Sequence, residues 1–444
     1  MTDLLAARLQ MGISLGFHIV FACIGMTMPW LMAIASYRWL KTRDPGYRDL
    51  ARAWSKGVAV FFAVGAVSGT VLSFELGLLW PRFMEHAGPI IGLPFSWEGT
   101  AFFVEAIALG LFLYGWEKLP EWAHFASGVV VGLSGVVSGV LVVAANGFMN
   151  SPRGFRWVDG RAVDIDPVAA MFNDAWASQA LHMVAAAFVS TCFAVAGVHA
   201  FRLLRGKNHA FHRRAYRIAL TTGAVFALLT PLTGDHSAKD VAVRQPAKLA
   251  AMEAHYHTSR GAGLLIGGIP DDATQEVHYG IELPYMLSVL AFADPHAEVK
   301  GLEEFADRPP TLVTHLAFQV MVGVGTLLAA VGALALFLRL RGSGHLYDAR
   351  LLRVVASCAP LGFLAVEAGW TVTEVGRQPW IIYGVMRTAD AVSPMPGLKW
   401  PLMVMLVVYA ALTCVVALVM RRLVTASERA LDADEALHGE PEHA

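Results

Sequence analysis

Residues 370–380 combine acidic, basic and aromatic side chains at the end of a long apolar run. Within this segment Glu374 and Arg377 are three positions apart, and Pro379 follows two residues later. An ionisable side chain inside a bilayer is costly and persists where a function requires it. Proline lacks a backbone N–H, so Pro379 predicts a helix end there. The segment indicates either a functional carboxylate near the membrane surface or a Glu374–Arg377 ion pair that seals the helix end.

Other apolar runs contain further side chains that can bind iron. Counted at 1.5 Å per residue, His18, Glu98, His182 and Met321 lie roughly 5–15 Å below one membrane surface. Histidine plus methionine is a ligand set for low-spin haem, and a second histidine without a strong partner suits a five-coordinate haem with an open position. The shared depth favours a metal or haem site over isolated, hydrogen-bonded core residues.

Carboxylates also recur at a regular spacing. Glu98 and Glu105 are seven residues apart, as are Glu367 and Glu374. That spacing places each pair on one helix face, two turns apart. Stacked carboxylates in a membrane helix suit a proton relay, which a hydroxyl such as that of Ser138 could extend. Serines in membrane helices are also ordinary packing residues.

The composition is that of an integral membrane protein. Of 444 residues, 56% are hydrophobic and only 16% are charged, whereas a soluble domain carries about 25% charged residues. The net charge of −1 gives no indication of nucleic acid as a partner. The first apolar run is long for a signal peptide and lacks a basic start, so we expect a mature span.

Nine apolar runs reach the length of about 20 residues that a bilayer-spanning helix needs. They cover residues 12–37, 54–79, 95–115, 124–148, 172–203, 213–234, 310–338, 351–375 and 399–420. The connecting segments are alternately rich and poor in Lys and Arg, and the positive-inside rule then places the N-terminus outside and the C-terminus in the cytoplasm. We predict an all-α integral membrane protein with nine transmembrane helices.

Four regions follow from this count. Residues 1–234 hold the first six helices, with the candidates for a high-spin haem and a proton path. Residues 235–309 form a long extracytoplasmic connection that we expect to be functional, since ordinary loops are far shorter; its residues 240–255 read as a short amphipathic helix. Residues 310–423 hold the last three helices, and residues 424–444 form an acidic cytoplasmic tail that we expect to be disordered.

Longer motifs narrow the interpretation. The most specific lies at 369–390 and contains Gly-Arg-Gln-Pro-Trp at 376–380. Others lie at 97–105, 145–149 and 234–271. Together these motifs make most of the chain resemble subunit I of the cytochrome bd-type quinol oxidases, and residues 234–271 resemble that family's quinol-binding loop.

The resemblance implies three haems: two haem b groups, one low-spin and one high-spin, and a haem d or a third haem b. His182 and Met321 would ligate the low-spin haem b. His18 and Glu374 would be the axial ligands of the two high-spin haems, and which of them serves the oxygen-binding haem stays open. Trp370 would lie against the haems.

The resemblance also implies roles in proton and quinol chemistry. Glu98 and Glu105 would deliver protons to the oxygen site, and Lys248 and Glu253 match loop positions linked to quinol oxidation. Arg377 would lie at the haem propionates. Ubiquinol or menaquinol would be oxidised at the outer face with proton release, and dioxygen would be reduced to water with cytoplasmic protons, which makes the reaction electrogenic.

The family further implies partners and a location. A second large membrane subunit, cytochrome bd subunit II, is expected in the bacterial cytoplasmic (inner) membrane, and a small single-span subunit is compatible with the resemblance. Gln319 stands two positions before Met321, where many members carry Arg, so the potential of the low-spin haem is open. Three features resemble the cyanide-insensitive branch: Gln319, a quinol loop that is short for the family, and Ser-Trp-Glu-Gly at 96–99. In that branch the haem d spectrum can be weak or absent.

Two other functions are weighed against this one. A haem-bearing membrane electron carrier would not reduce oxygen. A haem-free, proton-coupled transporter would gather its ionisable residues near the bilayer midplane rather than at one surface.

Overall fold

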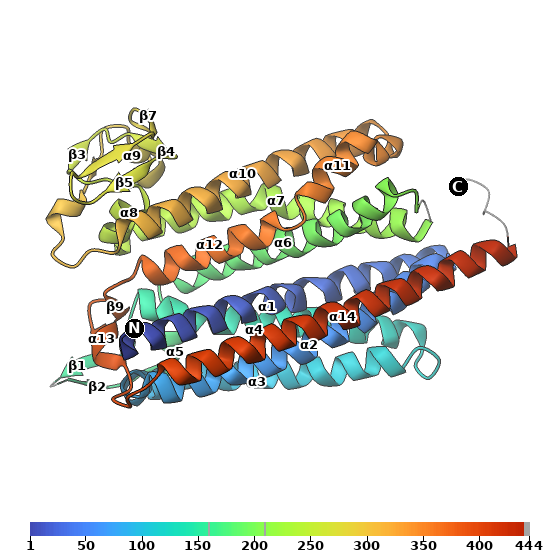
Figure 1. The fold of residues 1–444 in the computed structure, drawn as a ribbon, viewed down its shortest axis with the longest axis horizontal. Coiled ribbons are helices and arrows are strands. Elements are labelled where there is room, and N and C mark those ends of the chain that lie inside the picture. Colours follow the sequence, from blue (N-terminus) through green and yellow to red (C-terminus); the bar gives the residue numbers. More distant parts are fainter. Residues whose placement is uncertain (159, 208–209, 439–444) are drawn as a thin grey trace.

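The computed structural model describes residues 1–158, 160–207 and 210–438. Long helices run side by side along the longest axis, and small strands gather at one end together with the N-terminus (Figure 1). In these described ranges, nine helical segments are long and apolar enough to cross a membrane. The predicted all-α fold with nine transmembrane helices is therefore confirmed; the sidedness of the two termini stays a prediction.

The nine spans are α1 (Asp3–Thr42), α2 (Pro45–Leu79), α3 (Pro81–Tyr114), α4 (Glu121–Asn150), α6 (Trp176–Leu204), α7 (Ala210–Arg244), α10 (Thr311–Arg341), α11 (Ala349–Ser357) with α12 (Leu361–Val375), and α14 (Lys399–His438). Four shorter helices connect them: α5 (Pro167–Met171), α8 (Pro246–Met252), α9 (Met286–Phe292) and α13 (Thr388–Ala391). Two 3-10 turns are η1 (Leu302–Glu304) and η2 (Ser343–Tyr347).

Ten short strands form antiparallel pairs outside the helix bundle. The pairs are β1 (Arg156–Val158) with β2 (Arg161–Val163), β3 (Ser259–Arg260) with β8 (Glu298–Val299), β4 (Leu264–Ile266) with β7 (Ile281–Leu283), β5 (Ile269–Asp271) with β6 (Glu276–His278), and β9 (Trp380–Ile382) with β10 (Met386–Arg387). Three of them fold residues 259–299 into a compact cap next to α8, at one end of α7 and α10 (Figure 1).

The eighth span consists of two helices, because the chain breaks between α11 and α12. Pro360 lies in this break and cannot donate the N–H that a continuous helix would need. Both halves pack closely on α6. A Cβ on Gly362 would lie 2.4 Å from the Ser190 Cα, and one on Gly197 would lie 2.5 Å from the Ala359 Cβ. Glycine at these positions lets the helix that carries Glu374 approach α6.

Several predicted boundaries were wrong. Residues 81–94 are helical and extend α3, although we expected a connection there. The expected helix at 240–255 is instead the end of α7 followed by α8, because Pro246 lacks the N–H for a continuous helix. The tail expected to be disordered from 424 continues α14 to His438, and residues 439–444 lie outside the described residues.

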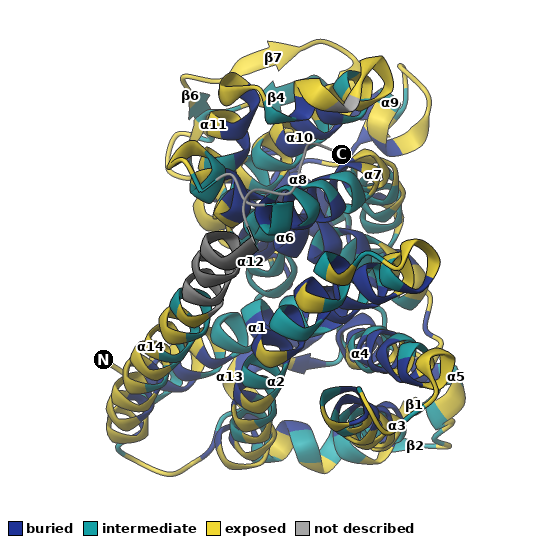
Figure 2. Ribbon diagram, turned by 90° about the vertical axis from the view of Figure 1, so that its right-hand side faces the viewer, coloured by how far each residue is buried: buried dark blue, intermediate teal, exposed yellow. Residues whose placement is uncertain are grey.

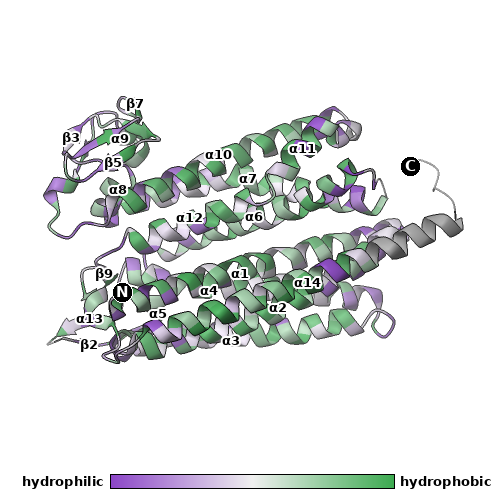
Figure 3. Cartoon of the chain, viewed as in Figure 1, coloured by the Kyte–Doolittle hydropathy of each residue, from purple (hydrophilic) through white to green (hydrophobic). Residues whose placement is uncertain are grey.

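Burial follows the packing of the spans. Figure 2 shows buried residues where the spans face one another and exposed residues along the outer faces. Many exposed residues are large and apolar, notably on α14, where Trp400, Val404 and Val407 are at least 64% exposed. Figure 3 shows hydrophobic residues along the helices and hydrophilic residues gathered at their ends. Apolar outer faces suit a hydrocarbon environment, which confirms a multi-pass membrane protein.

Candidate functional site

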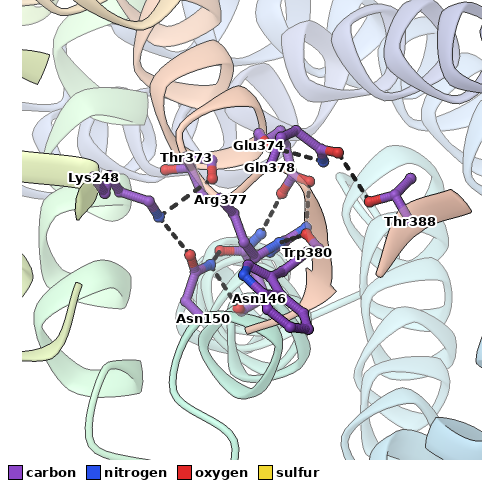
Figure 4. A network of polar contacts seen from close by, with 9 residues as sticks. All are labelled: Asn146, Asn150, Lys248, Thr373, Glu374, Arg377, Gln378, Trp380 and Thr388. Atoms are coloured by element: carbon purple, nitrogen blue, oxygen red, sulfur yellow. Dashed lines mark hydrogen bonds and ion pairs between the residues drawn. The ribbon is translucent and has the colours of Figure 1, made fainter. Parts of the chain in front are cut away.

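Glu374 lies in a polar network that joins α4, α8 and α12 (Figure 4). Asn146 Nδ2 donates to Glu374 Oε1 over 2.6 Å, and Arg377 Nη2 donates to Glu374 Oε2 over 2.6 Å. Arg377 is only 2% exposed. The Glu374–Arg377 ion pair, one of the two alternatives for this segment, is thus present, and its arginine is buried. Two donors fix both oxygens of the carboxylate, as a ligand of defined orientation requires.

The helix that carries Glu374 ends earlier than we predicted. α12 ends at Val375, and the Gly376 N–H donates to Val372 O over 2.9 Å. The helix therefore ends four residues before Pro379, which we had expected to stop it. Gln378 and Thr388 then hold the following turn, because the Thr388 hydroxyl donates to Gln378 Oε1 over 2.9 Å.

Lys248 extends the network to the predicted quinol loop. Lys248 Nζ donates to Asn150 Oδ1 over 2.6 Å and to Thr373 O over 3.4 Å. Asn150 Nδ2 in turn donates to Asn146 Oδ1 over 2.9 Å. A continuous chain of hydrogen bonds therefore runs from Lys248 on α8 through both asparagines to Glu374 on α12 (Figure 4).

Lys248 and Glu253 are both buried, at 4% and 3% exposure. Burial lowers the pKa of Lys248 to about 7; Arg377 lowers it as well, while Glu374 opposes the shift. Burial also raises the pKa of Glu253 to about 8, and its Oε2 has no hydrogen-bond partner among the described residues. Both groups can therefore exchange protons near neutral pH. They do not form an ion pair with each other within the described ranges.

His18 on α1 and His182 on α6 have matching surroundings. His18 Nδ1 lies 2.9 Å from Ser68 Oγ, and His182 Nδ1 lies 3.1 Å from Thr233 Oγ1. Each hydroxyl donates its own hydrogen to a backbone carbonyl of its helix, over 2.9 Å from Ser68 to Val64 O and 3.0 Å from Thr233 to Thr230 O. Each hydroxyl must then accept from Nδ1–H. This tautomer leaves the Nε2 lone pair of each histidine available to bind iron.

Met321 on α10 packs directly against α12. A Cβ on Gly369 would lie 2.9 Å from Met321 Sδ, so only glycine at 369 leaves the sulfur in place. Trp370, the next residue, is half-buried against an apolar cluster of α1, α6 and α12 that includes Ile19, Ala187 and Val366. The cluster therefore includes the neighbours of His18 on α1 and brings the three helices together.

The predicted proton carriers lie on α3 and α12. Ser138 Oγ on α4 donates to Glu98 Oε1 on α3 over 3.0 Å. Glu105, seven residues after Glu98 on the same face of α3, is buried. On α12, Glu367 Oε1 is buried without a partner in the described part of the chain. Its Oε2 approaches α1, where a Cβ on Gly16 would lie 2.9 Å away.

These residues fit haem groups. No three His, Cys, Asp or Glu side chains among the described residues are placed to hold a metal ion together. Each candidate ligand instead stands singly on its helix, as an axial ligand does when a porphyrin supplies the other donors. In addition, Arg377 Nη1 is buried and has no partner in the described ranges, so it can donate to a propionate.

Sequence reasoning missed several partners of these residues. Ser68 and Thr233 were not singled out, because a hydroxyl in an apolar helix gives no signal of what it faces. Asn150 was missed as well, although it stands four residues after Asn146 on one helix face, a spacing that could have drawn attention.

Comparison with known proteins gives consistent matches. The family model described as cytochrome bd terminal oxidase subunit I matches residues 6–428. A relative from Bacillus subtilis (strain 168), provisionally named cytochrome bd menaquinol oxidase subunit I, is 36% identical over 425 residues, covering 95% of this chain and 96% of the relative. Cytochrome bd ubiquinol oxidase subunit 1 of the same organism is 31% identical over 409 residues, covering 89% and 87%. The solved structure of bd oxidase from Geobacillus thermodenitrificans superposes with a TM-score of 0.91 at 36% identity, covering 96% of this chain and 99% of that one.

Proposed function

Because the chain belongs to the cytochrome bd terminal oxidase subunit I family, we propose that it is the catalytic, haem-bearing subunit of a quinol:oxygen oxidoreductase. Quinol would be oxidised at the outer face with proton release, and dioxygen would be reduced to water with cytoplasmic protons, so that turnover is electrogenic. Cytochrome bd subunit II would complete the enzyme in the bacterial cytoplasmic membrane.

The haem ligands are assigned by motif and supported by the local geometry. His182 and Met321 would hold a low-spin haem b, and His18 and Glu374 would hold two high-spin haems, one haem b and one haem d or further haem b. Both histidines keep Nε2 available through their hydroxyl partners. When bound, these groups supply electron transfer and the oxygen-binding iron.

One observation carries the proposal: the hydrogen-bonded chain from Lys248 to Glu374. It links α8, in the predicted quinol loop, to a predicted ligand on α12 through Asn150 and Asn146. Glu253 would accept a proton from quinol. Its Oε2 has no partner among the described residues, and its raised pKa makes it a base of suitable strength once ionised. Arg377 would bind a propionate and hold Glu374 in place.

Protons for oxygen reduction would follow α3. Glu98 is oriented by Ser138, and Glu105 lies two helix turns away on the same face. These carboxylates would hold and pass protons without becoming part of the iron coordination. Glu367, whose Oε1 is buried and unpartnered in the described ranges, would be a further proton carrier on α12.

The test is a reduced-minus-oxidised optical spectrum of the purified two-subunit complex, with and without carbon monoxide, combined with haem extraction. The proposal predicts one low-spin b signal, at least one carbon-monoxide-sensitive high-spin signal, and three haems per complex. Low-spin bands without a carbon-monoxide-sensitive species would show an electron carrier instead. No haem bands would support the proton-coupled transporter.

A further inference from the structure

A large hollow opens at the end of the bundle opposite the strand cap. Its cavity volume is about 260 Å³, and it lies between α1, α2, α6, α7, α12 and α14. The predicted haem ligands do not line it. Sites that enclose a whole small organic ligand typically have volumes of about 300–1,000 Å³, so this hollow suits one slender group rather than a bulky molecule.

Most of the wall of the hollow is apolar. Its lining includes Ile24, Phe61, Val195, Phe363 and Leu423, and no acidic residue in the described ranges contributes to it. On α6 the lining extends from Thr191 to Arg202, a rise of eleven residue steps or about 16 Å of helix. One leaflet of a hydrocarbon core of about 30 Å has nearly that depth. The hollow thus matches a single acyl chain that enters from one membrane surface.

The open end of the hollow is basic. Lys56 and Arg202 line it, and on α14 Arg421 and Arg422 lie between the lining residues Met420 and Leu423 without lining the hollow themselves. Three other arginines at this end already have carboxylate partners: Arg43 with Glu121, Arg52 with Glu117, and Arg214 with Asp44. Among the described residues, Lys56, Arg421 and Arg422 form no ion pair. Of these three, Lys56 lines the hollow and leaves positive charge at its mouth for an anionic headgroup.

The polar side chains that line the hollow are few. Thr191 is 1% exposed, lines the hollow, and its Oγ1 has no hydrogen-bond partner in the described part of the chain. Closer to the mouth, His199 and His212 line the wall and contact each other through Nδ1 atoms 2.9 Å apart.

We propose that this hollow is a binding site for one anionic phospholipid of the leaflet at the predicted cytoplasmic surface. An acyl chain lies between α2, α6 and α14, and Lys56 binds the phosphate. Basic pockets between membrane helices on the cytoplasmic side bind anionic headgroups in general. Because the lipid would contact α14 on one side and α2 and α6 on the other, it would hold α14 in place against these two helices.

The test uses two matched pairs of variants in the purified two-subunit complex. Gly57 lines the hollow, and a Cβ there would lie 3.6 Å from Met420 Cε, which is ordinary contact. Gly57→Ala therefore leaves the hollow open, whereas Gly57→Leu fills it. Lys56→Arg keeps the charge at the mouth, whereas Lys56→Gln removes it. Each complex is stripped of lipid, mixed with phosphatidylglycerol or phosphatidylcholine, and examined by native mass spectrometry.

We expect one phosphatidylglycerol to be retained per complex, in preference to phosphatidylcholine, by the parent, Gly57→Ala and Lys56→Arg. Gly57→Leu should lose it, and Lys56→Gln should bind about fivefold more weakly. Equal retention of both lipids, or unchanged retention in Gly57→Leu and Lys56→Gln, would overturn the proposal. Competition by glycerol phosphate at the same concentration would show an anion site instead, and a co-purified quinone in the hollow would show a different ligand. The haem content of each variant shows whether it folds. If Gly57→Leu does not assemble, the comparison of Lys56→Arg with Lys56→Gln tests the proposal.

Discussion

Replacing Glu253 with glutamine is expected to remove the pH dependence of quinol oxidation. Glu253 is 3% exposed, burial raises its pKa to about 8, and Oε2 has no partner in the described ranges. A carboxyl with a raised pKa is neutral below that value and becomes a base as the pH rises through it. The base that accepts the proton from quinol is therefore the minor form at pH 7.

The size of the effect follows from that pKa. With a pKa of about 8, the ionised fraction of Glu253 is about 9% at pH 7 and 50% at pH 8, so kcat/KM for quinol should rise about fivefold between them. Lys248, with a pKa of about 7, also titrates in this range. Its neutral amine still has two N–H groups, enough for Asn150 and Thr373, so its hydrogen bonds do not require the ammonium form.

The assay is oxygen uptake with quinol from pH 6.5 to 8.5, repeated with an artificial reductant that bypasses the quinol site. In Glu253→Gln the rise of kcat/KM with pH (the rising limb of the pH profile) should disappear. Its kcat/KM at pH 8 should be at least about 100-fold lower than that of the parent, because a positioned general base contributes that much. Oxygen uptake with the artificial reductant should stay at the parent value. Glu276→Gln, an exposed carboxylate on β6 of the same loop, is the control and should behave as the parent.

Two results would refute this reasoning. A rising limb that persists in Glu253→Gln would show that another group titrates. An equal loss of activity with quinol and with the artificial reductant, at unchanged haem content, would place the defect outside the quinol site.

Three other predictions concern the remaining site residues. His182→Ala or Met321→Ala should each abolish the low-spin haem signal, and preserved spectra in both would reject the ligand assignment. Glu98→Gln should slow turnover about tenfold or more while haem content is kept, because an amide cannot pass a proton; an unchanged rate would reject the proton role. Lys248→Met should raise KM for quinol about tenfold by removing the bond to Asn150, with oxygen uptake from an artificial reductant intact; an unaltered KM would argue against a loop role.

The membrane architecture could be predicted from the sequence because the bilayer imposes it. Each crossing forces about 20 apolar residues, so hydropathy alone located all nine spans found among the described residues. The predicted helix ends were wrong where a helix continues beyond the hydrocarbon core. The start of α3 at Pro81 carries Arg82, Glu85 and His86, polar residues that a helix tolerates once water or headgroups surround it. Hydropathy marks the edge of the hydrocarbon, not the end of the helix.

The site was predictable in its motif residues but not in their partners. The family motifs pointed to Glu374, Arg377 and Lys248, and the structure places all three in one network. Which hydroxyl faces His18 or His182 depends on how α2 and α7 are rotated about their axes, which packing decides. The sequence pattern also does not show that such a hydroxyl donates to a carbonyl of its own helix and therefore accepts from the histidine.

The central claim is that separate helices bring iron ligands to one layer beneath the surface next to the strand cap. An experimental density map of the assembled two-subunit complex tests it most directly. The account predicts a porphyrin whose iron lies between His182 Nε2 and Met321 Sδ, and two further porphyrins at His18 and Glu374 in the same layer. A map that shows this layer without porphyrin, or His182 and Met321 directed apart into lipid, would contradict the account.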